Sequence, residues 1–341
     1  MAERRTSLRD VAQAVGVSVQ TVSRVANGEP NVAPEKRELI LTTMRELGYR
    51  PNAAARAIRR GSFRTVGVVY YNLHSVGTHR SLEEISERAA ERGYATTLMP
   101  LAATSGRAAN GAFTRLGEMA VDVLIVILPA PFGVDETLQL PEGVPTVVLG
   151  PPLVEGVASV DFDQEVGARE AVGHLLDLGH ETVHHITGPA VSFSAEARCR
   201  AWMQVLTERG RPIPSTRSGD WSPGSGYEAT KRLLREERPT AIFAANDQMA
   251  LGAYRAIIEA GLRIPEDVSL VGFDDIDEAE MFAPPLTTVR QDWGLLGRQS
   301  LRVALEMERG APPEHVRLPT GLVPRNSTAS PRASTAPPRA G

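Results

Sequence analysis

The chain has 341 residues, of which 42% are hydrophobic and 23% charged, which is ordinary for a globular protein and long enough for two or three domains. No apolar run approaches the roughly 20 residues that a membrane span needs, and the amino-terminal MAERRTSLRD lacks the apolar core of a signal peptide. These features exclude an integral membrane protein and, with a single Cys199 that cannot form an internal disulfide, predict a cytoplasmic location.

The charges are divided unevenly along the chain. The first 60 residues hold 11 Lys and Arg against 6 Asp and Glu, a net charge of +5, whereas the remaining residues carry a net charge of −9. A basic segment joined to an acidic body is expected when only that segment meets a polyanion. The sign change therefore predicts a separate nucleic-acid-binding domain, although solvated charge on a small helical domain would look the same.

Residues 7–27, SLRDVAQAVGVSVQTVSRVAN, predict two short helices joined by a tight turn. Apolar residues recur at helical spacing before Gly16, and Ser18 stands where an N-cap hydroxyl is expected for a second helix over residues 19–26. Gln and Arg side chains form bidentate hydrogen bonds with purine edges in a major groove, and hydroxyls reach phosphates. The pattern predicts a helix-turn-helix whose second helix exposes Val19, Gln20, Thr21 and Arg24. Spacing alone equally allows a plain amphipathic hairpin.

A third helix is predicted over residues 34–47, with Pro34 in its first turn and Gly48 ending it. The Ala-rich run that follows, residues 50–60, lies between Pro51 and Gly61 and is too short to be a stable helix alone in water. It is a candidate hinge that becomes helical only when something else orders it. The alternative is a linker that touches nothing.

From Arg64 onward, short β-branched runs alternate with amphipathic helices, a pattern that predicts parallel sheets covered by helices on both faces. Strands are predicted at residues 65–71, 94–99, 121–128, 145–149, 182–187, 240–244 and 268–273, and helices at 81–92, 164–178, 195–209, 225–236, 248–260 and 293–309. This stretch is too long for one sheet, so we expect two subdomains with a cleft at the carboxyl ends of their strands. The chain should cross between them near residues 160–164 and 290–292.

The amino-acid sequence of the headpiece resembles that of a known family. The stretch LRDVAQAVGVSVQTVSRVANG, followed by RELGYRPN at 45–52 and AARAI at 54–58, resembles the DNA-binding headpiece of the lactose/galactose repressor family. The resemblance implies that the hinge folds on an operator and inserts an apolar side chain into the minor groove. Ile58 stands where the family usually has Leu. The DNA-binding residues implied are Ser18, Val19, Gln20, Thr21, Ser23, Arg24, Asn27, Asn52, Ala55, Arg56 and Ile58.

The resemblance continues through the body to about Arg325, over VHHITGP at 183–189, NDQMALG at 246–252, VGFDD at 271–275 and PPLTTVRQD at 284–292. It implies a fold of the periplasmic-binding-protein type and a sugar in the cleft, held by Arg198, Asn246 and Asp274. Such side chains supply the donors and acceptors that vicinal hydroxyls need. The full predicted set is Tyr71, His74, Phe162, Asp163, Arg198, Trp221, Asn246, Asp274, Gln291 and Trp293.

The first subdomain departs from the family at two points. The segment Tyr71-Asn-Leu-His-Ser-Val-Gly77 replaces an Asn-Pro-Phe-Phe type of segment, and Gly150 follows a strand where the family can have a ligand-binding Asp. The identity of the ligand is therefore open.

Two other motifs receive structural interpretations. His180-Glu-Thr-Val-His184 matches the H-E-x-x-H zinc signature, but Gly179 ends the helix before it, and four residues of strand span roughly 13 Å, too far for two ligands of one zinc. Ser222-Pro-Gly-Ser-Gly226 is Gly-rich, yet it is better explained as a helix start with Ser222 as the cap.

The sequence thus predicts an α/β protein in which an all-α helix-turn-helix headpiece precedes a two-subdomain body with parallel sheets. The expected boundaries are 1–50 for the headpiece, 51–61 for the hinge, 62–325 for the body and 326–341 for a disordered tail. Within the body, one subdomain takes about 62–161 and 292–322, and the other about 162–291. The tail lacks a leucine heptad helix of the kind that joins dimers into tetramers, so a homodimer is expected.

The expected function is a transcriptional repressor without cofactor, metal or enzymatic activity, whose hold on a pseudo-palindromic operator is weakened by a sugar such as a galactoside. A regulator tightened by its ligand is the first alternative. A solute-binding protein for transport is the second, and it would need a signal peptide and no helix-turn-helix.

Overall fold

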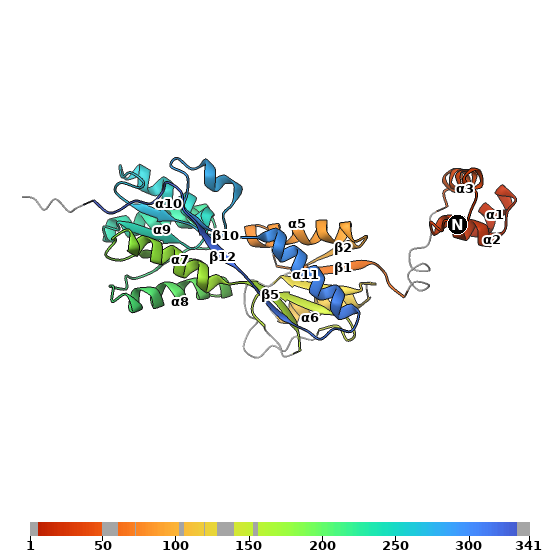
Figure 1. Ribbon diagram of the computed structural model, residues 1–341, viewed down its shortest axis with the longest axis horizontal. Coiled ribbons are helices and arrows are strands. Elements are labelled where there is room, and N and C mark those ends of the chain that lie inside the picture. The colour runs from red at the N-terminus through yellow and green to blue at the C-terminus, as the bar shows by residue number, and fades with distance from the viewer. Residues whose placement is uncertain are drawn as a thin grey trace, which may run out of the picture. The chain divides into compact units, whose positions relative to one another are not determined.

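The computed structural model describes residues 6–49, 61–71, 73–101, 106–118, 120–127, 140–152 and 156–332. The chain divides into two compact units, Met1–Arg64 and Thr65–Gly341 (Figure 1). Each unit encloses a hydrophobic core of its own.

The first unit contains three helices, α1 (Leu8–Val15), α2 (Val19–Ala26) and α3 (Pro34–Glu46). Gly16 ends α1 in the left-handed conformation at φ 70°, and the Ser18 hydroxyl caps α2 by accepting a hydrogen bond from the Thr21 amide at 3.1 Å. The buried residues that join the helices are Val11, Ala12, Val22, Val25, Ile40 and Met44. The prediction of a helix-turn-helix is confirmed. Of the predicted hinge, residues 51–61, all but Gly61 lie outside the described residues.

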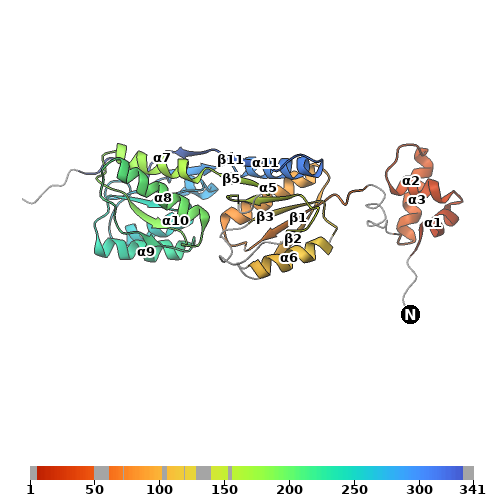
Figure 2. The same cartoon turned by 90° about the horizontal axis from the view of Figure 1, so that it is seen from below.

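The second unit has two lobes, which we call the N-lobe (65–162 and 293–318) and the C-lobe (163–291 and 319–332). The N-lobe is built on a six-stranded parallel sheet in the order β11-β5-β4-β3-β1-β2. Its strands are β1 (Thr65–Tyr70), β2 (Ala95–Pro100), β3 (Val123–Ile127), β4 (Thr146–Leu149), β5 (Ala158–Phe162) and β11 (His315–Leu318). Helices α5 (Val76–Glu91) and α11 (Trp293–Glu308) cover one face, and α6 (Gly106–Glu118) covers the other (Figure 2).

The C-lobe repeats this arrangement on a smaller parallel sheet in the order β7-β6-β8-β9. Its strands are β6 (His184–Thr187), β7 (Arg217–Ser218), β8 (Ala241–Ala244) and β9 (Ser269–Val271). Helices α7 (Gln164–Asp177) and α8 (Phe193–Glu208) cover one face, whereas α9 (Pro223–Glu236) and α10 (Asp247–Glu259) cover the other. Along β8, Ala241 and Phe243 enter one core and Ile242 and Ala244 the other, which explains why these strands are apolar without alternation.

The chain passes between the lobes three times. The first passage joins β5 to α7, and the second joins β10 (Thr288–Gln291) to α11, as predicted. The third, from β11 to β12 (Thr320–Val323), was not predicted. Residues 320–322 were assigned to the first subdomain, but β12 pairs antiparallel with β10 and Leu322 packs against the core of the C-lobe. The four-residue strand TGLV gives no local signal of a partner so distant in sequence.

The prediction of a disordered tail from residue 326 is wrong for residues 326–332. The Ser327 side chain is fully buried, its hydroxyl donates to the Leu270 carbonyl at 2.6 Å, and the same oxygen accepts from the Thr287 amide at 2.8 Å. The Ser269 hydroxyl accepts from the Ala329 amide at 3.0 Å. These backbone contacts hold a Ser/Ala/Pro segment that has no apolar periodicity, so composition could not reveal them. Residues 333–341 lie outside the described part of the chain.

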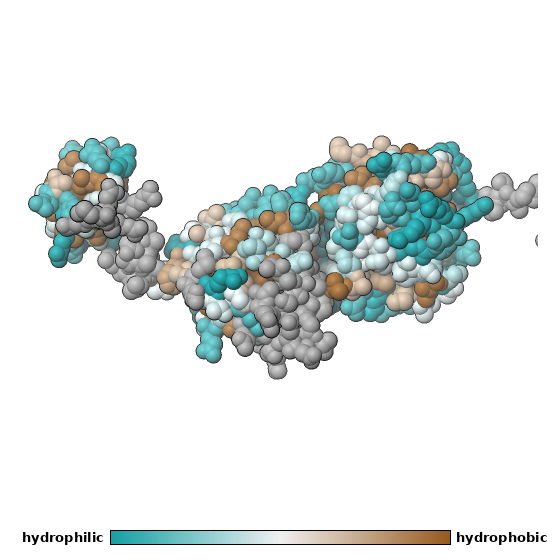
Figure 3. Space-filling model, turned by 180° about the vertical axis from the view of Figure 1, so that it is seen from behind, coloured by the Kyte–Doolittle hydropathy of each residue, from teal (hydrophilic) through white to brown (hydrophobic). Residues whose placement is uncertain are grey.

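Within the described residues, no helix is both long enough and apolar enough to cross a membrane. The face in Figure 3 shows hydrophobic side chains as separate patches among hydrophilic ones.

Candidate functional site

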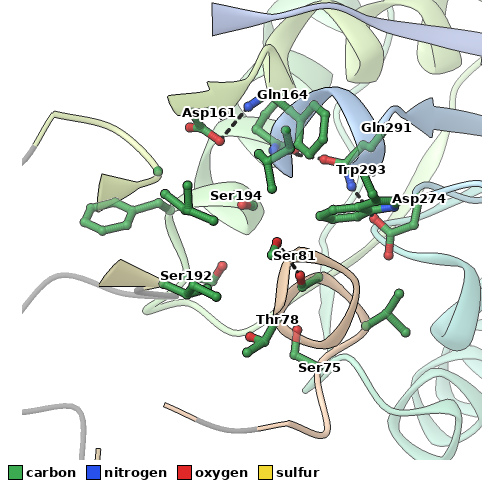
Figure 4. A pocket seen from close by; sticks show the side chains of 18 of the residues that line it. Ser75, Thr78, Ser81, Asp161, Gln164, Ser192, Ser194, Asp274, Gln291 and Trp293 are labelled. Carbon is green, nitrogen blue, oxygen red and sulfur yellow. Dashed lines mark hydrogen bonds between the residues drawn. The ribbon is translucent and has the colours of Figure 1, made fainter. Parts of the chain in front are cut away.

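A cavity with both polar and apolar walls lies between the two lobes of the body, where the parallel strands of both sheets end. Its empty volume, including the open mouth, is about 840 Å³, within the range of roughly 300 to 1,000 Å³ for small-molecule sites. The N-lobe contributes Ser75, Thr78, Ser81, Leu149, Gly150, Asp161, Phe162 and Trp293, and the C-lobe contributes Gln164, Ser192, Arg198, Trp221, Asn246, Asp274 and Gln291. Figure 4 shows part of this cavity.

Arg198 is the cation of the cavity, and protein atoms hold it on several sides. Its Nε donates to the Gln164 Oε1 at 2.9 Å, its Nη1 donates to the Ala245 carbonyl, and its Nη2 pairs with the Asp274 carboxylate at 3.7 Å. The guanidinium carbon lies 3.6 Å from the centroid of the Phe273 ring. Burial lowers the pKa of Arg198 to about 10, so the side chain is still charged at neutral pH.

Asp274 lies in a strained backbone segment shortly after β9, at the end of the C-lobe sheet that faces the cavity. Asp274 and Asp275 have φ values of 113° and 53°, a region that L-residues occupy at a cost of about 1 to 3 kcal/mol. The Gln291 Nε2 donates to the Asp274 Oδ1 at 2.8 Å. Burial raises the pKa of Asp274 to about 6, although Arg198 and Gln291 oppose that rise. Strain of this kind persists where the surroundings fix the residue, as they do here.

Asn246 connects a helix cap to the loop that carries Trp221. Its Oδ1 accepts from the Met249 amide at 2.9 Å and so caps α10, while its Nδ2 donates to the Trp221 carbonyl at 3.1 Å. Trp221 itself has a positive φ of 74°. A Cβ on Gly188 would approach the Trp221 ring to 2.4 Å, so only glycine leaves room for that ring.

The sequence analysis missed several polar residues of the cavity, among them Asp161 and Gln164. Asp161 accepts a hydrogen bond from the Phe162 amide at 2.8 Å and another from the Gln164 side chain (Figure 4). Burial raises the pKa of Asp161 to about 6. The Gln164 Nε2 also donates to the Gln291 Oε1 at 3.2 Å. An acid in the mostly buried strand ASVDF is the sequence signal that could have identified Asp161.

The structure brings together seven of the ten predicted effector residues: Phe162, Arg198, Trp221, Asn246, Asp274, Gln291 and Trp293. The Phe162 and Trp293 rings meet edge to face with centroids 5.0 Å apart.

The other three predicted residues do not line this cavity. Tyr71 packs against the N-lobe core beneath α6, and His74 lines a separate hollow beside α5. Asp163 caps α7 by accepting from the Val166 amide at 3.1 Å. Its carboxylate therefore serves as the N-cap of α7.

The headpiece presents a second candidate site on α2. Ser18, Val19, Gln20 and Arg24 are exposed, and Thr21, Ser23 and Asn27 are half-buried. The hydroxyls of Ser18 and Thr21 lie 2.9 Å apart. Because Val22 and Val25 face the core, the polar residues form the outer surface of the helix. The predicted residues Asn52, Ala55, Arg56 and Ile58 lie outside the described part of the chain.

The H-E-x-x-H match and the Gly-rich segment, which we interpreted as structural, form contacts with neighbouring protein groups. His180 lies 3.1 Å from the Ser269 hydroxyl through its Nε2, and His184 lies in β6 with its Nε2 2.7 Å from Glu237. Ser222 caps α9 by accepting from the Ser225 amide at 3.2 Å, with Pro223 in the first turn.

A helix-turn-helix unit followed by a two-lobed body with a polar cleft defines the class of ligand-responsive DNA-binding regulators. Residues 7–52 match the bacterial regulatory proteins of the lacI family, and residues 172–328 match the periplasmic binding protein-like domain. The chain is similar to the lactose operon repressor of Escherichia coli strain K12, with 36% identity over 95% of this chain and 91% of that protein. It also resembles the transcriptional repressor PurR of Haemophilus influenzae, with 33% identity over 88% of this chain and 90% of that protein.

Solved structures agree with these matches. A lac repressor dimer bound to operator and the anti-inducer ONPF has a TM-score of 0.86 and 34% identity over 96% of this chain and all of that one. The transcriptional regulator CelR in complex with cellobiose has a TM-score of 0.70 and 31% identity over 95% of this chain and all of that one. The chain belongs to the lacI family of bacterial regulatory proteins. The prediction of a DNA-binding transcriptional repressor, and not an enzyme, is confirmed.

Proposed function

We propose that the chain acts in the cytoplasm as a homodimer that represses transcription from a pseudo-palindromic operator and releases that operator when a small sugar occupies the cleft. Galactosides and related glycosides are the first effectors to test. The α2 surface would read the major groove, and residues 51–61 would form the hinge. Sugar binding would change how the lobes sit against each other and so disturb the paired hinges.

The observation that carries this proposal is the composition of the cavity wall. Aromatic rings come from both lobes, Trp293 from the N-lobe and Trp221 from the C-lobe, beside Asp274 and Gln291. Sugar rings present apolar C–H faces to aromatic side chains, and their hydroxyls can donate to carboxylates and can both donate to and accept from amides. One wall from each lobe means that an occupant contacts both lobes. A ligand shifts an equilibrium by its different affinity for two states, so such contacts can favour one lobe arrangement.

The relatives support the proposal by analogy. Structures similar to this chain contain the lac repressor with ONPG or ONPF and CelR with cellobiose. One of the structures with ONPF is a lac repressor dimer bound to an operator.

The experiment is a gel-shift titration of the full chain on DNA from the promoter nearest its own gene, at one fixed salt concentration and across a sugar panel. We expect one neutral glycoside to weaken operator binding by at least about tenfold, or about 1.4 kcal/mol. Tightening instead would identify a corepressor-dependent regulator and contradict the proposed release. No effect from any sugar would contradict a sugar response altogether.

Arg198→Lys is the matched variant for the cleft. It keeps the positive charge near Asp274, and thereby avoids leaving a buried carboxylate without a cation, but it loses the planar fork that reaches Gln164 and Ala245. Operator binding without sugar should survive in this variant, and the sugar response should fall. A normal response would remove Arg198 from the site.

A further inference from the structure

The charge of the cleft is the starting observation. Among the described residues that line the cavity, the charged side chains are Asp161, Asp274 and Arg198, two acids and one base. The Nε, Nη1 and Nη2 of Arg198 each have a protein partner. An entering ligand therefore meets two carboxylates and one guanidinium that is already paired with one of them.

Asp161 lies on the strand beside β4, next to the glycine that follows β4. Strands β4 and β5 are neighbours in the sheet, with Leu149 opposite Val160. Gly150, which follows β4, lines the cavity without a side chain, and Asp161 follows Val160 into the same cavity. The cavity therefore receives no side chain from the residue after β4, and an acid on the adjacent strand reaches it instead. Asp161 is half-buried, so part of it is accessible.

Two glutamines hold the acids in place. The Gln164 Oε1 accepts from Arg198, which is only a donor, so the Nε2 of the same amide must face the other way. That nitrogen bonds Asp161 and the Gln291 Oε1, and the Gln291 Nε2 bonds Asp274. The resulting chain, Asp161–Gln164–Gln291–Asp274, fixes the two carboxylates around the cavity (Figure 4).

The carboxylates keep further hydrogen-bonding capacity. An ionised carboxylate has about four acceptor positions and no donor. Asp161 uses two of them, on the Phe162 amide and the Gln164 side chain. Its remaining positions call for hydroxyl donors from the ligand, and they repel phosphate and carboxylate groups.

We propose that Asp161 is a ligand-binding residue that, together with Asp274, selects uncharged polyhydroxyl effectors and rejects phosphorylated and acidic sugars. This inference rests on the proposed sugar response and specifies the chemical class of its effector. Gln164 is a positioning residue, because it acts on the ligand through Asp161.

The test uses the full-length protein and matched probes: the methyl glycosides of glucose, galactose and mannose, the 6-phosphates of the three sugars, and the corresponding uronates. Binding is measured by isothermal titration calorimetry for the wild type, Asp161→Asn and Asp163→Asn. Asp163 is the control because it is an acid two residues away that caps α7 outside the cavity, and Asn is also a good cap. Circular dichroism checks that each variant is folded.

We expect the wild type to bind a neutral glycoside and to bind its phosphate and uronate at least about tenfold more weakly. Asp161→Asn should weaken neutral binding by about tenfold and reduce the preference for neutral over anionic probes by a similar factor. Asp163→Asn should stay within about twofold of the wild type. A purely structural role for Asp161 would weaken all probes equally and leave the preference unchanged.

Three results would overturn the proposal. Unchanged affinity and preference in Asp161→Asn would remove Asp161 from the site, and a wild type that prefers phosphates or uronates would overturn the chemical class. If no probe of any kind binds, the proposed sugar response fails first and the role of Asp161 fails with it. The first two outcomes leave the sugar response standing, so the failures are distinguishable.

Discussion

Gln20 and Val19 lie side by side at the start of α2, and both are exposed; Val19 has 41% of its surface accessible. An apolar residue left exposed at the end of a short helix, next to an amide, suits contact with base edges and thymine methyl groups. Neither residue belongs to the core of the headpiece. Specificity and folding should therefore be separable at these positions.

Exchanging Val19 and Gln20 for other side chains should change the preferred operator and leave the stability of the headpiece nearly unchanged. A good bidentate contact discriminates between bases by about 1 to 3 kcal/mol. Selection from random duplexes measures the preference, and thermal unfolding measures stability. Retention of the wild-type base preference would disprove the assignment of the reading helix.

The two cavity acids should make stability depend on pH. Burial raises the pKa of Asp161 to about 6, with Arg198 and Arg317 as the facing cations that oppose this rise, whereas a free Asp has a pKa of about 3.9. Between these values the unfolded state ionises first, so the native state binds more protons and the free energy of unfolding falls as pH rises. The destabilisation grows through this range and reaches its full extent about one pH unit above the native pKa.

Asp161→Asn should therefore raise the free energy of unfolding by about 1 kcal/mol at neutral pH. This value is already reduced to allow for the partial exposure of the side chain. Near pH 4 the variant and the wild type should have the same free energy of unfolding. Urea denaturation at the two pH values measures the difference. Burial lowers the pKa of His185 to about 4, so this residue destabilises the protein as pH falls. The effect is equal in the wild type and in Asp161→Asn, and it therefore cancels in their difference. An equal gain at both pH values would mean that removal of the charge is not the cause.

The sequence predicted most of the site but assigned one acid to the wrong place. Arg198, Asn246 and Asp274 were assigned to the cavity by resemblance, and they line it. Asp163 was assigned there too, whereas the structure gives that place to Asp161. The difference depends on where β5 ends and α7 begins, because a residue just before a helix turns its carboxylate to the first-turn amides. The start of α7 at Gln164 was predicted correctly, but β5 was not predicted, so the local pattern did not separate the acid that caps the helix from the acid that lines the cavity.

At the scale of elements, local signals placed the helices well and the edge strands poorly. The predicted bounds of α2 agree with the structure, α7 ends one residue earlier than predicted, and α10 begins and ends one residue earlier than predicted. In contrast, α6 and the strands β5, β7, β10, β11 and β12 were not predicted. The sequence of α6, GRAANGAFTRLGE, contains three glycines that lower its intrinsic helix propensity. Strand β12 depends on β10, and such long-range pairing leaves no local pattern.

The segment 326–332 leads to a test by truncation. A chain ending at Arg325 loses Ser327, so the Leu270 amide and carbonyl and the Thr287 amide lose their partners in the C-lobe. Three hydrogen bonds at about 1 kcal/mol each should lower the free energy of unfolding by about 3 kcal/mol.

A chain ending at Arg332 is the matched control and should unfold like the full chain. Chemical denaturation followed by circular dichroism compares the three proteins. Equal stability of the two truncated chains would show that the segment does not stabilise the C-lobe.

At the scale of the whole molecule, the proposed mechanism needs a connection between the cleft and the reading helix. The chain between them, residues 50–60, is known here only from its sequence. If this segment becomes helical only on DNA, as its length and Ala content predict, it contributes to binding only on the correct operator.

Ile58→Gly should then reduce specific binding far more than non-specific binding, because the Lys and Arg contacts with phosphates remain. The ratio of operator affinity to random-DNA affinity should fall by about tenfold or more, and the sugar effect should shrink with it. Both affinities must be measured at one salt concentration, with and without sugar. An unchanged ratio would make the segment a passive tether.

The positions of the tryptophans offer a way to follow these events without labels. The chain has three, of which Trp221 and Trp293 face the same cavity from opposite lobes. Trp202 is 1% exposed, and its indole nitrogen donates to the Val183 carbonyl at 2.8 Å. Intrinsic fluorescence of the unmodified protein should thus have two emitters whose surroundings change as the cleft fills, above a constant background from a third. Trp221→Phe and Trp293→Phe would separate the signals of the two walls, so the movement of each lobe could be timed on its own.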